Sequence, residues 1–190
     1  MKNERGRGAH EVALTADDHA LGDPHAGLTL LEYGDYECAA CIQAEPLTKH
    51  LVETFGKRLR FIYRHFPLVE THLQAELAAE AAEAAAAQGE FWAMHHLLLS
   101  PPHQLGLPAL TAHAQSIGLD MNRFNAEMAD RIYTQRIQEH RRAGERSGIH
   151  AVPSFFLNGT PVDVSFGFQK LEEAIHVALH DASRASAKHP

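Results

Sequence analysis

Apolar residues change their periodicity along the chain, and this change predicts three parts. Residues 28–33 and 59–66 are short apolar runs, which predict two strands. Between them, apolar residues recur every three to five positions over residues 42–55, which predicts a helix. Gly56 is expected to end that helix, and Pro46 is expected to kink it. The first part is therefore predicted to be strand, helix, strand.

Residues 67–147 carry a helical pattern without a strand. Helices are predicted at 71–88, 91–99, 107–117 and 130–146, with a further one that begins at Asp120. The first of these is rich in alanine and carries Glu76, Glu80 and Glu83 on one face. We expect that acidic face to be solvated, as on an ordinary surface helix.

The strand pattern returns after Gly148. Residues 154–157 form a short apolar run, and an Asn-Gly pair at 158–159 is a strong signal for a hairpin turn. Residues 161–164 are expected to form the return strand. Residues 168–182 then carry an amphipathic helical pattern.

The predicted order is β-α-β, a helical block, and β-β-α, which indicates an α/β protein. We expect the two halves to share one sheet, with the all-helical block inserted between them. The expected divisions are a flexible lead-in with a short strand (1–16, strand at 11–15), a first half that opens with a loop (17–66, loop at 17–27), the insertion (67–148), a second half (149–182) and a polar tail (183–190).

Composition narrows the class of protein. The chain has 190 residues, enough for one domain with a sizeable insertion. Acidic residues number 24 and basic residues 17, which argues against binding to nucleic acid or to an anionic membrane. No apolar stretch approaches the roughly 18 residues of a membrane-spanning helix. The N-terminal residues lack the apolar core of a secretion signal, so a cytoplasmic location is expected.

Cys38 and Cys41 are the two cysteines of the chain, and their C-x-x-C spacing places them where a predicted helix begins. The positive end of the helix dipole and the free N–H groups favour a thiolate at Cys38. Because Cys41 follows three residues later, its sulfur falls on the same helix face. From this helix-start geometry we expect Cys38 to be the exposed, reactive thiol and Cys41 to be buried in the first turn. Two cysteines this close indicate a chemical site and not a disulfide framework.

Four other residues are candidates for the same site. Glu32 lies in the strand before the cysteines, where burial should raise the pKa of its carboxyl and suit it to accept a proton from the second thiol. The Val152–Pro153 bond precedes a strand and is expected to be cis. Tyr36 lies close enough in sequence to contact a bound partner.

These motifs carry a family resemblance over roughly residues 17–180. The chain resembles the DsbA-like branch of the thioredoxin superfamily in three segments. These are GDYECAAC after LTLLEY, then LRFIYRHFPL, and then AVPSFFLNG. The resemblance implies a thioredoxin fold with an inserted helical domain. It also implies thiol–disulfide oxidoreductase activity that needs no organic cofactor.

The resemblance further implies roles for individual residues. Cys38 would attack, Cys41 would resolve, and Glu32 would be the buried acid. Pro153 would be the cis-proline opposite the disulfide, and the substrate backbone would lie along Val152. The implied partners are a protein or small thiol or disulfide substrate and a recycling thiol reductant or oxidant.

The residues between the cysteines depart from the strongly oxidising relatives. Those relatives have Pro-His, whereas this chain has Ala39-Ala40. Without an imidazole, the helix dipole alone would bring the pKa of Cys38 to roughly 7–8. We therefore expect reductase or isomerase behaviour and weak oxidase behaviour.

Two other classes of function stay open. A metal-binding or metal-delivery protein would use Cys38 and Cys41 with histidines such as His25, His65, His72, His95 and His96. A non-catalytic interaction domain would keep the fold alone. The chain has 15 histidines, most of which are expected at the surface, and the preferred interpretation assigns no metal.

Overall fold

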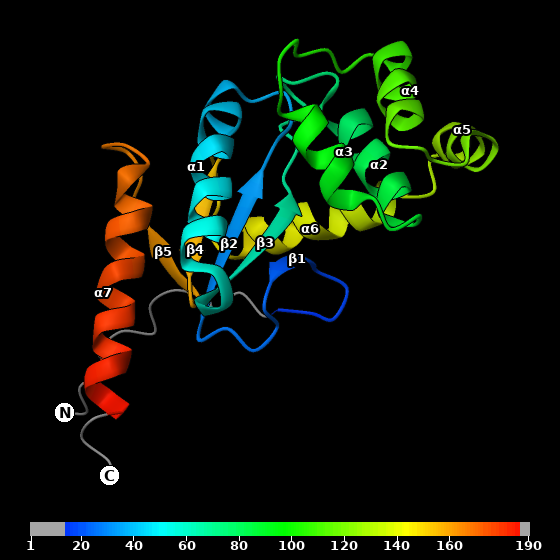
Figure 1. Ribbon diagram of the computed structural model, residues 1–190. Coiled ribbons are helices and arrows are strands. Elements are labelled where there is room, and N and C mark those ends of the chain that lie inside the picture. Colours follow the sequence, from blue (N-terminus) through cyan, green and yellow to red (C-terminus); the bar gives the residue numbers. More distant parts are fainter. Residues whose placement is uncertain (1–13, 187–190) are drawn as a thin grey trace.

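Residues 14–186 are described by the computed structural model of the chain, drawn in Figure 1. In this part of the chain a five-stranded sheet has the order β1-β3-β2-β4-β5. The strands are β1 (His19–Gly22), β2 (Leu28–Gly34), β3 (Leu59–His65), β4 (Ser154–Leu157) and β5 (Thr160–Val162). The helices are α1 (Ala39–Phe55), a 3₁₀ turn (Gly56–Arg58), α2 (Ala75–Ala86), α3 (Phe91–Leu98), α4 (Leu107–Ser116), α5 (Met121–Asp130), α6 (Thr134–Arg146) and α7 (Gln169–Ser186).

The central strand β2 pairs in parallel with β3 and antiparallel with β4. Strand β2, helix α1 and strand β3 form the first half, and β4, β5 and α7 form the second. Helices α2 to α6 lie between the two halves in sequence. The predicted α/β thioredoxin fold with a helical insertion is confirmed.

The two faces of the sheet bury separate clusters because side chains alternate along a strand. Leu30 of β2 belongs to the larger cluster, which also holds residues of α1, α2, α3 and α7. Leu31 and Tyr33 belong to the smaller cluster on the opposite face. Glu32 therefore points to the same face as Leu30, toward α1.

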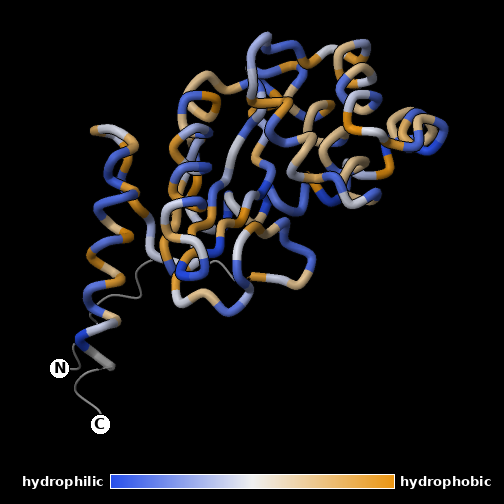
Figure 2. The backbone as a smooth tube through the Cα atoms, viewed as in Figure 1, coloured by the Kyte–Doolittle hydropathy of each residue, from blue (hydrophilic) through white to orange (hydrophobic). Residues whose placement is uncertain are grey.

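Two helices show how the outer layers are built. Figure 2 shows hydrophobic and hydrophilic residues alternating along α7, whose Leu171 and Ile175 are buried. Helix α6 packs against β3 and lies behind the sheet in Figure 1. A side chain at Gly144 of α6 would meet the Phe66 ring at 2.8 Å, so only glycine allows this close approach.

Two of the three acids on the acidic face of α2 are not solvated, contrary to the sequence prediction. Glu80 and Glu83 are buried, as are the alanines on every side of α2. Small side chains let the neighbouring helices surround α2, so its acids face protein instead of water. Glu80 accepts hydrogen bonds from Arg131 and Thr134.

The N-terminal part of the sheet also differs from the prediction. Residues 19–22 form β1, antiparallel to β3, where a loop was expected. Trp92 of α3 donates its indole N–H to the Ala20 carbonyl at 3.2 Å, a contact between distant parts of the chain. The strand predicted at 11–15 falls largely outside the described residues, and Leu14 and Thr15 are not in a strand.

Smaller differences concern the ends of elements. Helix α7 continues to Ser186, so the predicted polar tail is helical at its start. Helix α6 begins at Thr134 because Arg131 adopts φ 52° and ends α5. The Asp120 side chain accepts from the N–H groups of Asn122 and Arg123, which confirms it as the α5 cap. The division of the chain at residues 67 and 148 stays a prediction.

Candidate active site

The two cysteines lie at the start of α1. Cys38 is the N-cap residue and is half-buried, whereas Cys41 in the first turn is buried. Both are free thiols. The backbone N–H of Asp35 donates to the Cys41 sulfur at 3.4 Å. As predicted, the first cysteine is the accessible one.

The two thiols have opposite pKa shifts. A hydrogen bond from the Cys41 thiol, together with the N–H groups of Cys41 and Ala40, lowers the pKa of Cys38 to about 6 against the effect of burial. The same hydrogen bond, burial and the charges of Glu32 and Cys38 raise the pKa of Cys41. The pKa of Cys38 is lower than the predicted 7–8 because the helix-dipole argument left out the Cys41 thiol.

Glu32 lies on the α1 face of β2, in register with Tyr63 of β3 and Phe155 of β4. Its side chain is buried. Burial, followed by the charges of Glu45 and Cys38, raises the pKa of its carboxyl well above the ordinary value. The predicted direction of this pKa shift is confirmed, and the role of Glu32 as proton acceptor stays a prediction.

The Val152–Pro153 bond is cis, as predicted. The Cys38 sulfur lies 3.6 Å from the Val152 carbonyl oxygen, which accepts from the thiol. Val152 and Pro153 are both partly exposed, immediately before β4. The structure therefore brings together Cys38, Cys41 and the Val152–Pro153 loop.

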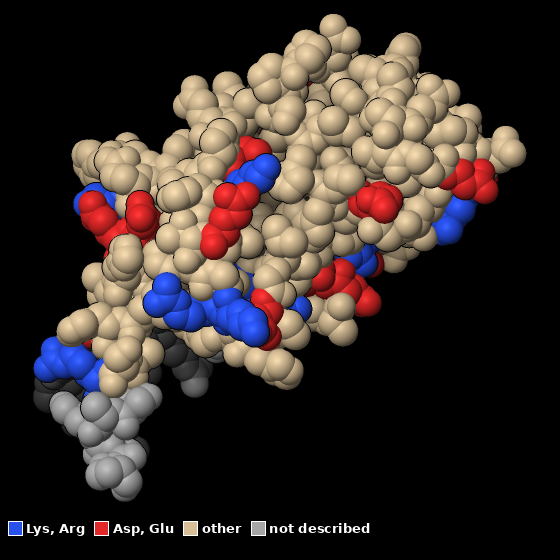
Figure 3. Space-filling view, viewed as in Figure 1, with Lys and Arg blue, Asp and Glu red and all other residues tan. Residues whose placement is uncertain are grey.

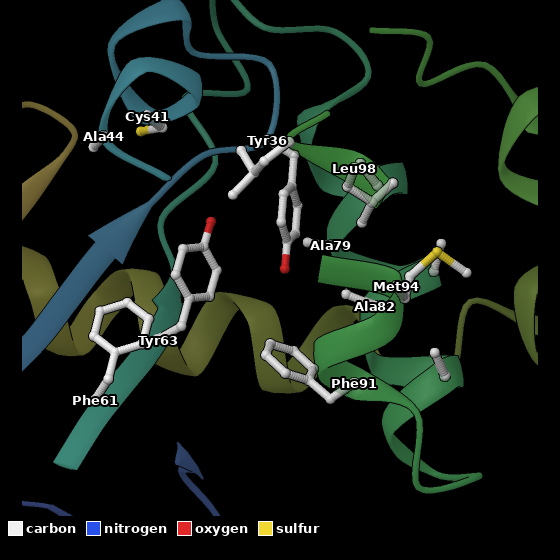
Figure 4. Packing of buried hydrophobic residues seen from close by; sticks show 14 of the residues in the cluster. Tyr36, Cys41, Ala44, Phe61, Tyr63, Ala79, Ala82, Phe91, Met94 and Leu98 are labelled. Atoms are coloured by element: carbon white, nitrogen blue, oxygen red, sulfur yellow. The ribbon is translucent and has the colours of Figure 1, made fainter. Parts of the chain in front are cut away.

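Tyr36 is not placed to contact a partner, contrary to the sequence prediction. Its side chain is buried, and its hydroxyl lies 3.0 Å from Nδ1 of His95. Figure 4 shows its ring between Tyr63 and Leu98. Tyr36 leaves the surface because the chain turns into the core between β2 and α1.

Asp35 is a site residue that the sequence analysis missed. Its buried carboxylate accepts from the N–H groups of Glu37 and Leu68 at 2.7 and 2.8 Å and pairs with Nδ1 of His72 at 2.8 Å. The pairing with Asp35 raises the pKa of His72. Asp35 therefore holds the loop before Cys38 against the segment after β3. The Asp two residues before Glu37 is an Asx-turn signal that could have indicated this.

Histidines do not complete a metal site with the cysteines. Among the described residues, two groups of potential ligands converge: His19, His65 and Glu83, and Glu45, His95 and His96. Neither group includes Cys38 or Cys41. His65 and His95 are buried, whereas most histidines were expected at the surface.

Sequence and structure comparisons agree with this geometry. The profile of the family described as Thioredoxin matches residues 14–176. A thioredoxin-like oxidoreductase from Silicibacter pomeroyi has 25% identity and a TM-score of 0.76, covering 90% of this chain and 94% of its own. BdbD from Bacillus subtilis has 19% identity and a TM-score of 0.75, covering 85% and 92%. The family match confirms the predicted membership of the thioredoxin superfamily.

Curated relatives match one part of larger proteins. A Na(+)/H(+) antiporter NhaA 1 from Salinispora arenicola is 40% identical over 162 residues, which are 85% of this chain and 25% of that protein. The NhaA of Herminiimonas arsenicoxydans is 38% identical over 171 residues, which are 90% and 26%. This chain therefore spans about a quarter of the length of these relatives. In its described part, no helix has the length and apolar character needed to cross a membrane.

Proposed function

The chain belongs to the thioredoxin family, and from that premise we propose that it exchanges disulfides through Cys38, acting as a reductase or isomerase. The observation that carries the proposal is the unequal pair of thiols. Cys38 is half-buried with a pKa lowered to about 6, whereas the buried Cys41 has a raised pKa. One sulfur is thus ready to attack at neutral pH, and the other stays protonated until it is needed.

The reaction runs through a mixed disulfide. The Cys38 thiolate attacks one sulfur of a substrate disulfide, forms an S–S bond to it and releases the other sulfur as a thiolate. Cys41 then loses its proton and attacks the Cys38 sulfur. This step forms the Cys38–Cys41 disulfide and releases the second substrate thiolate, so the substrate is reduced and the enzyme oxidised. A thiol reductant returns the pair to the dithiol.

Glu32 is proposed to take the proton of Cys41. The carboxyl lies on the α1 face of β2, and its charge contributes, after the hydrogen bond with Cys38 and burial, to the raised pKa of Cys41. A buried carboxyl with a raised pKa can accept and return a proton near neutral pH. The surrounding residues therefore supply the base that a buried thiol requires.

The substrate is proposed to be an extended polypeptide segment that carries a disulfide. The Val152 carbonyl is beside the attacking sulfur, so a backbone that pairs along Val152 would present its cysteine to Cys38. Figure 3 shows few Lys, Arg, Asp or Glu side chains toward the end of this face where α1 begins. This supports docking by backbone pairing instead of by charge.

The pKa of Cys38 supports a moderate redox poise. Strongly oxidising relatives stabilise the thiolate to a pKa of about 3.5, and thioredoxin has a pKa of about 7. A pKa of about 6 lies between them, nearer the reducing end. Turbidity from insulin reduction with a dithiol reductant and reactivation of a scrambled disulfide substrate test the proposal. An inert protein in both assays would favour the interaction-domain alternative.

We expect alkylation to label Cys38 with a half-maximal rate at pH about 6, and to leave Cys41 unlabelled in the folded protein. Replacing Cys41 with Ala removes the largest cause of the lowered pKa of Cys38. The pH profile of the Cys41→Ala variant should therefore shift upward, toward the ordinary thiol value. Iodoacetamide kinetics with peptide mass mapping provide the measurement. An unchanged profile would assign the shift to the backbone N–H groups alone.

We expect Glu32→Leu to raise the free energy of unfolding by about 1–3 kcal/mol at pH 7, because a buried polar group is removed. The unfolded carboxyl ionises near pH 4.3, whereas the folded one ionises at higher pH. Ionisation is therefore easier in the unfolded chain, and the advantage of the Leu variant should grow as pH rises above about 4.3. Urea unfolding at several pH values measures this.

Glu32→Gln is the matched control, since it keeps the shape and polarity of the side chain but cannot accept a proton. Both variants should slow the release of the mixed disulfide, and the Gln variant should lose the pH dependence. A Leu variant with lower stability and unchanged turnover would show that Glu32 is a structural residue only.

A further inference from the structure

A second cluster of ligand-type side chains lies between α1 and α3. Glu45 comes from the second turn of α1, and His95 and His96 are neighbours on α3. Glu45 Oε1 lies 2.5 Å from Nδ1 of His96, and Glu45 Oε2 lies 3.4 Å from Nε2 of His95. The three ligand atoms are all within 4.8 Å of one another.

His95 is the residue that points to a ligand. Its side chain is 1% exposed, and its Nε2 has no hydrogen-bond partner among the described residues. Its contact with Glu45 Oε2, at 3.4 Å, is longer than an ordinary N–H···O hydrogen bond. A buried polar atom without a partner is costly, and a cation between the imidazole and the carboxylate would remove that cost.

The other ring nitrogen of His95 has the partner that a metal ligand needs. Nδ1 lies 3.0 Å from the Tyr36 hydroxyl. Histidines that bind a metal through one nitrogen almost always donate the other N–H to an acceptor, which orients the ring. With its proton on Nδ1, His95 donates to Tyr36 and directs the lone pair of Nε2 toward Glu45.

We propose that Glu45, His95 and His96 bind one Zn²⁺ ion between α1 and α3. Two imidazoles and one carboxylate are a common zinc ligand set, and a water completes the fourth position. Solvent can reach the cluster, because the side chains of Glu45 and His96 are 12% and 38% exposed. The site uses neither cysteine and does not depend on the disulfide chemistry proposed above.

The second convergent group does not offer a comparable metal site. His19, His65 and Glu83 are equally close together. However, Arg136 donates its Nε–H to the same Glu83 oxygen that both histidines contact, at 2.9 Å. A guanidinium already supplies the positive charge there, so a metal ion has no place beside it.

Zinc uptake by the full chain tests the proposal once the thiols are removed as competitors. The background protein carries Cys38→Ser and Cys41→Ser, has no affinity tag, and is dialysed against Zn²⁺ before metal analysis. We expect one equivalent of zinc per chain, and visible d–d bands of a tetrahedral site when Co²⁺ replaces it. His96→Ala and Glu45→Gln in this background should lose the equivalent and the bands.

His180→Ala is the matched control, because His180 is 70% exposed on α7, away from the cluster. The His180→Ala variant should still bind one equivalent of zinc per chain. Circular dichroism verifies that each variant is folded, and the exposed position of His96 makes its variant the safer of the two. The proposal would be overturned if the background protein takes up no zinc. It would also be overturned if a folded His96→Ala variant keeps the equivalent of zinc and the cobalt bands.

Discussion

Cys38→Ser is expected to reduce disulfide exchange to the background rate of the assay. Cys38 carries the lowered pKa and lies beside the Val152 carbonyl, whereas Cys41 is buried. The chain's one other cysteine, Cys41, is buried and cannot take over the attack on a substrate. Insulin reduction followed by turbidity provides the measurement. Residual catalysis well above background would place the nucleophile elsewhere.

Cys41→Ser is the companion variant, with a different expected outcome. It keeps the attacking sulfur but removes the resolving one, so it should accumulate a mixed disulfide on Cys38. Mass spectrometry of the protein after incubation with oxidised glutathione detects the adduct. An adduct that forms equally on the Cys38→Ser variant would contradict the assignment of roles.

Asp18→Ala is expected to lower the free energy of unfolding by about 3–5 kcal/mol, because it leaves the Arg64 charge buried without its carboxylate. The Asp18 carboxylate accepts from Nε and an Nη of Arg64 at 2.6 and 2.7 Å, and the side chains are 1% and 5% exposed. Urea unfolding of the variant at pH 7 measures the loss. A loss below about 1 kcal/mol would contradict the expectation.

The pH dependence of the Asp18→Ala effect follows from the pKa of Asp18. Burial acts to raise that pKa, but the hydrogen bonds from Arg64 and Thr15 and the Arg64 charge outweigh it, so the pKa is lowered. The stabilisation is therefore complete above the unfolded value of about 3.9 and is lost as pH falls through the folded one. The difference in free energy of unfolding between the wild type and the Asp18→Ala variant should therefore become smaller in acid.

The double variant Asp18→Leu with Arg64→Met is the control for that pair. Replacing both buried charges by apolar side chains removes the two charges together and is often near neutral for stability. The Tyr33 hydroxyl would lose its bond from Arg64, so some loss is expected. The double variant should nevertheless be more stable than Asp18→Ala. If it is less stable, the pair contributes more than charge compensation.

Local sequence signals predict much of the fold and the centre of the site. The apolar runs of β2, β3 and β4 and the Asn-Gly turn are local patterns, and the structure follows them. The C-x-x-C spacing and the Val152–Pro153 junction also depend on near neighbours in the chain. Position at a helix start was enough to predict which cysteine is accessible.

Contacts between distant parts of the chain could not be predicted in this way. Glu83 on the alanine-rich helix is buried because His19 and Arg136, 64 and 53 residues away, donate to its carboxylate. The pairing of Glu45 with His96 spans 51 residues. Hydrophobic periodicity identifies a helix face, but it does not identify which charged side chains from elsewhere will meet it.

The pKa of Cys38 combines both kinds of information. The helix start predicted a lowered pKa, and the value of about 6 also needs the thiol of Cys41 as donor. That hydrogen bond depends on side-chain conformations within one turn. Sequence spacing makes the contact available, but it does not show which sulfur donates and which accepts.

Equilibration of the full chain with glutathione buffers tests the central claim most directly. We expect one reversible two-electron transition between the Cys38–Cys41 dithiol and disulfide. Because the pKa of Cys38 lies between those of thioredoxin and the strong oxidants, the potential should lie between about −270 and about −120 mV. Two results would contradict this expectation: the thiols never form the intramolecular disulfide in any buffer, or the potential lies above about −120 mV.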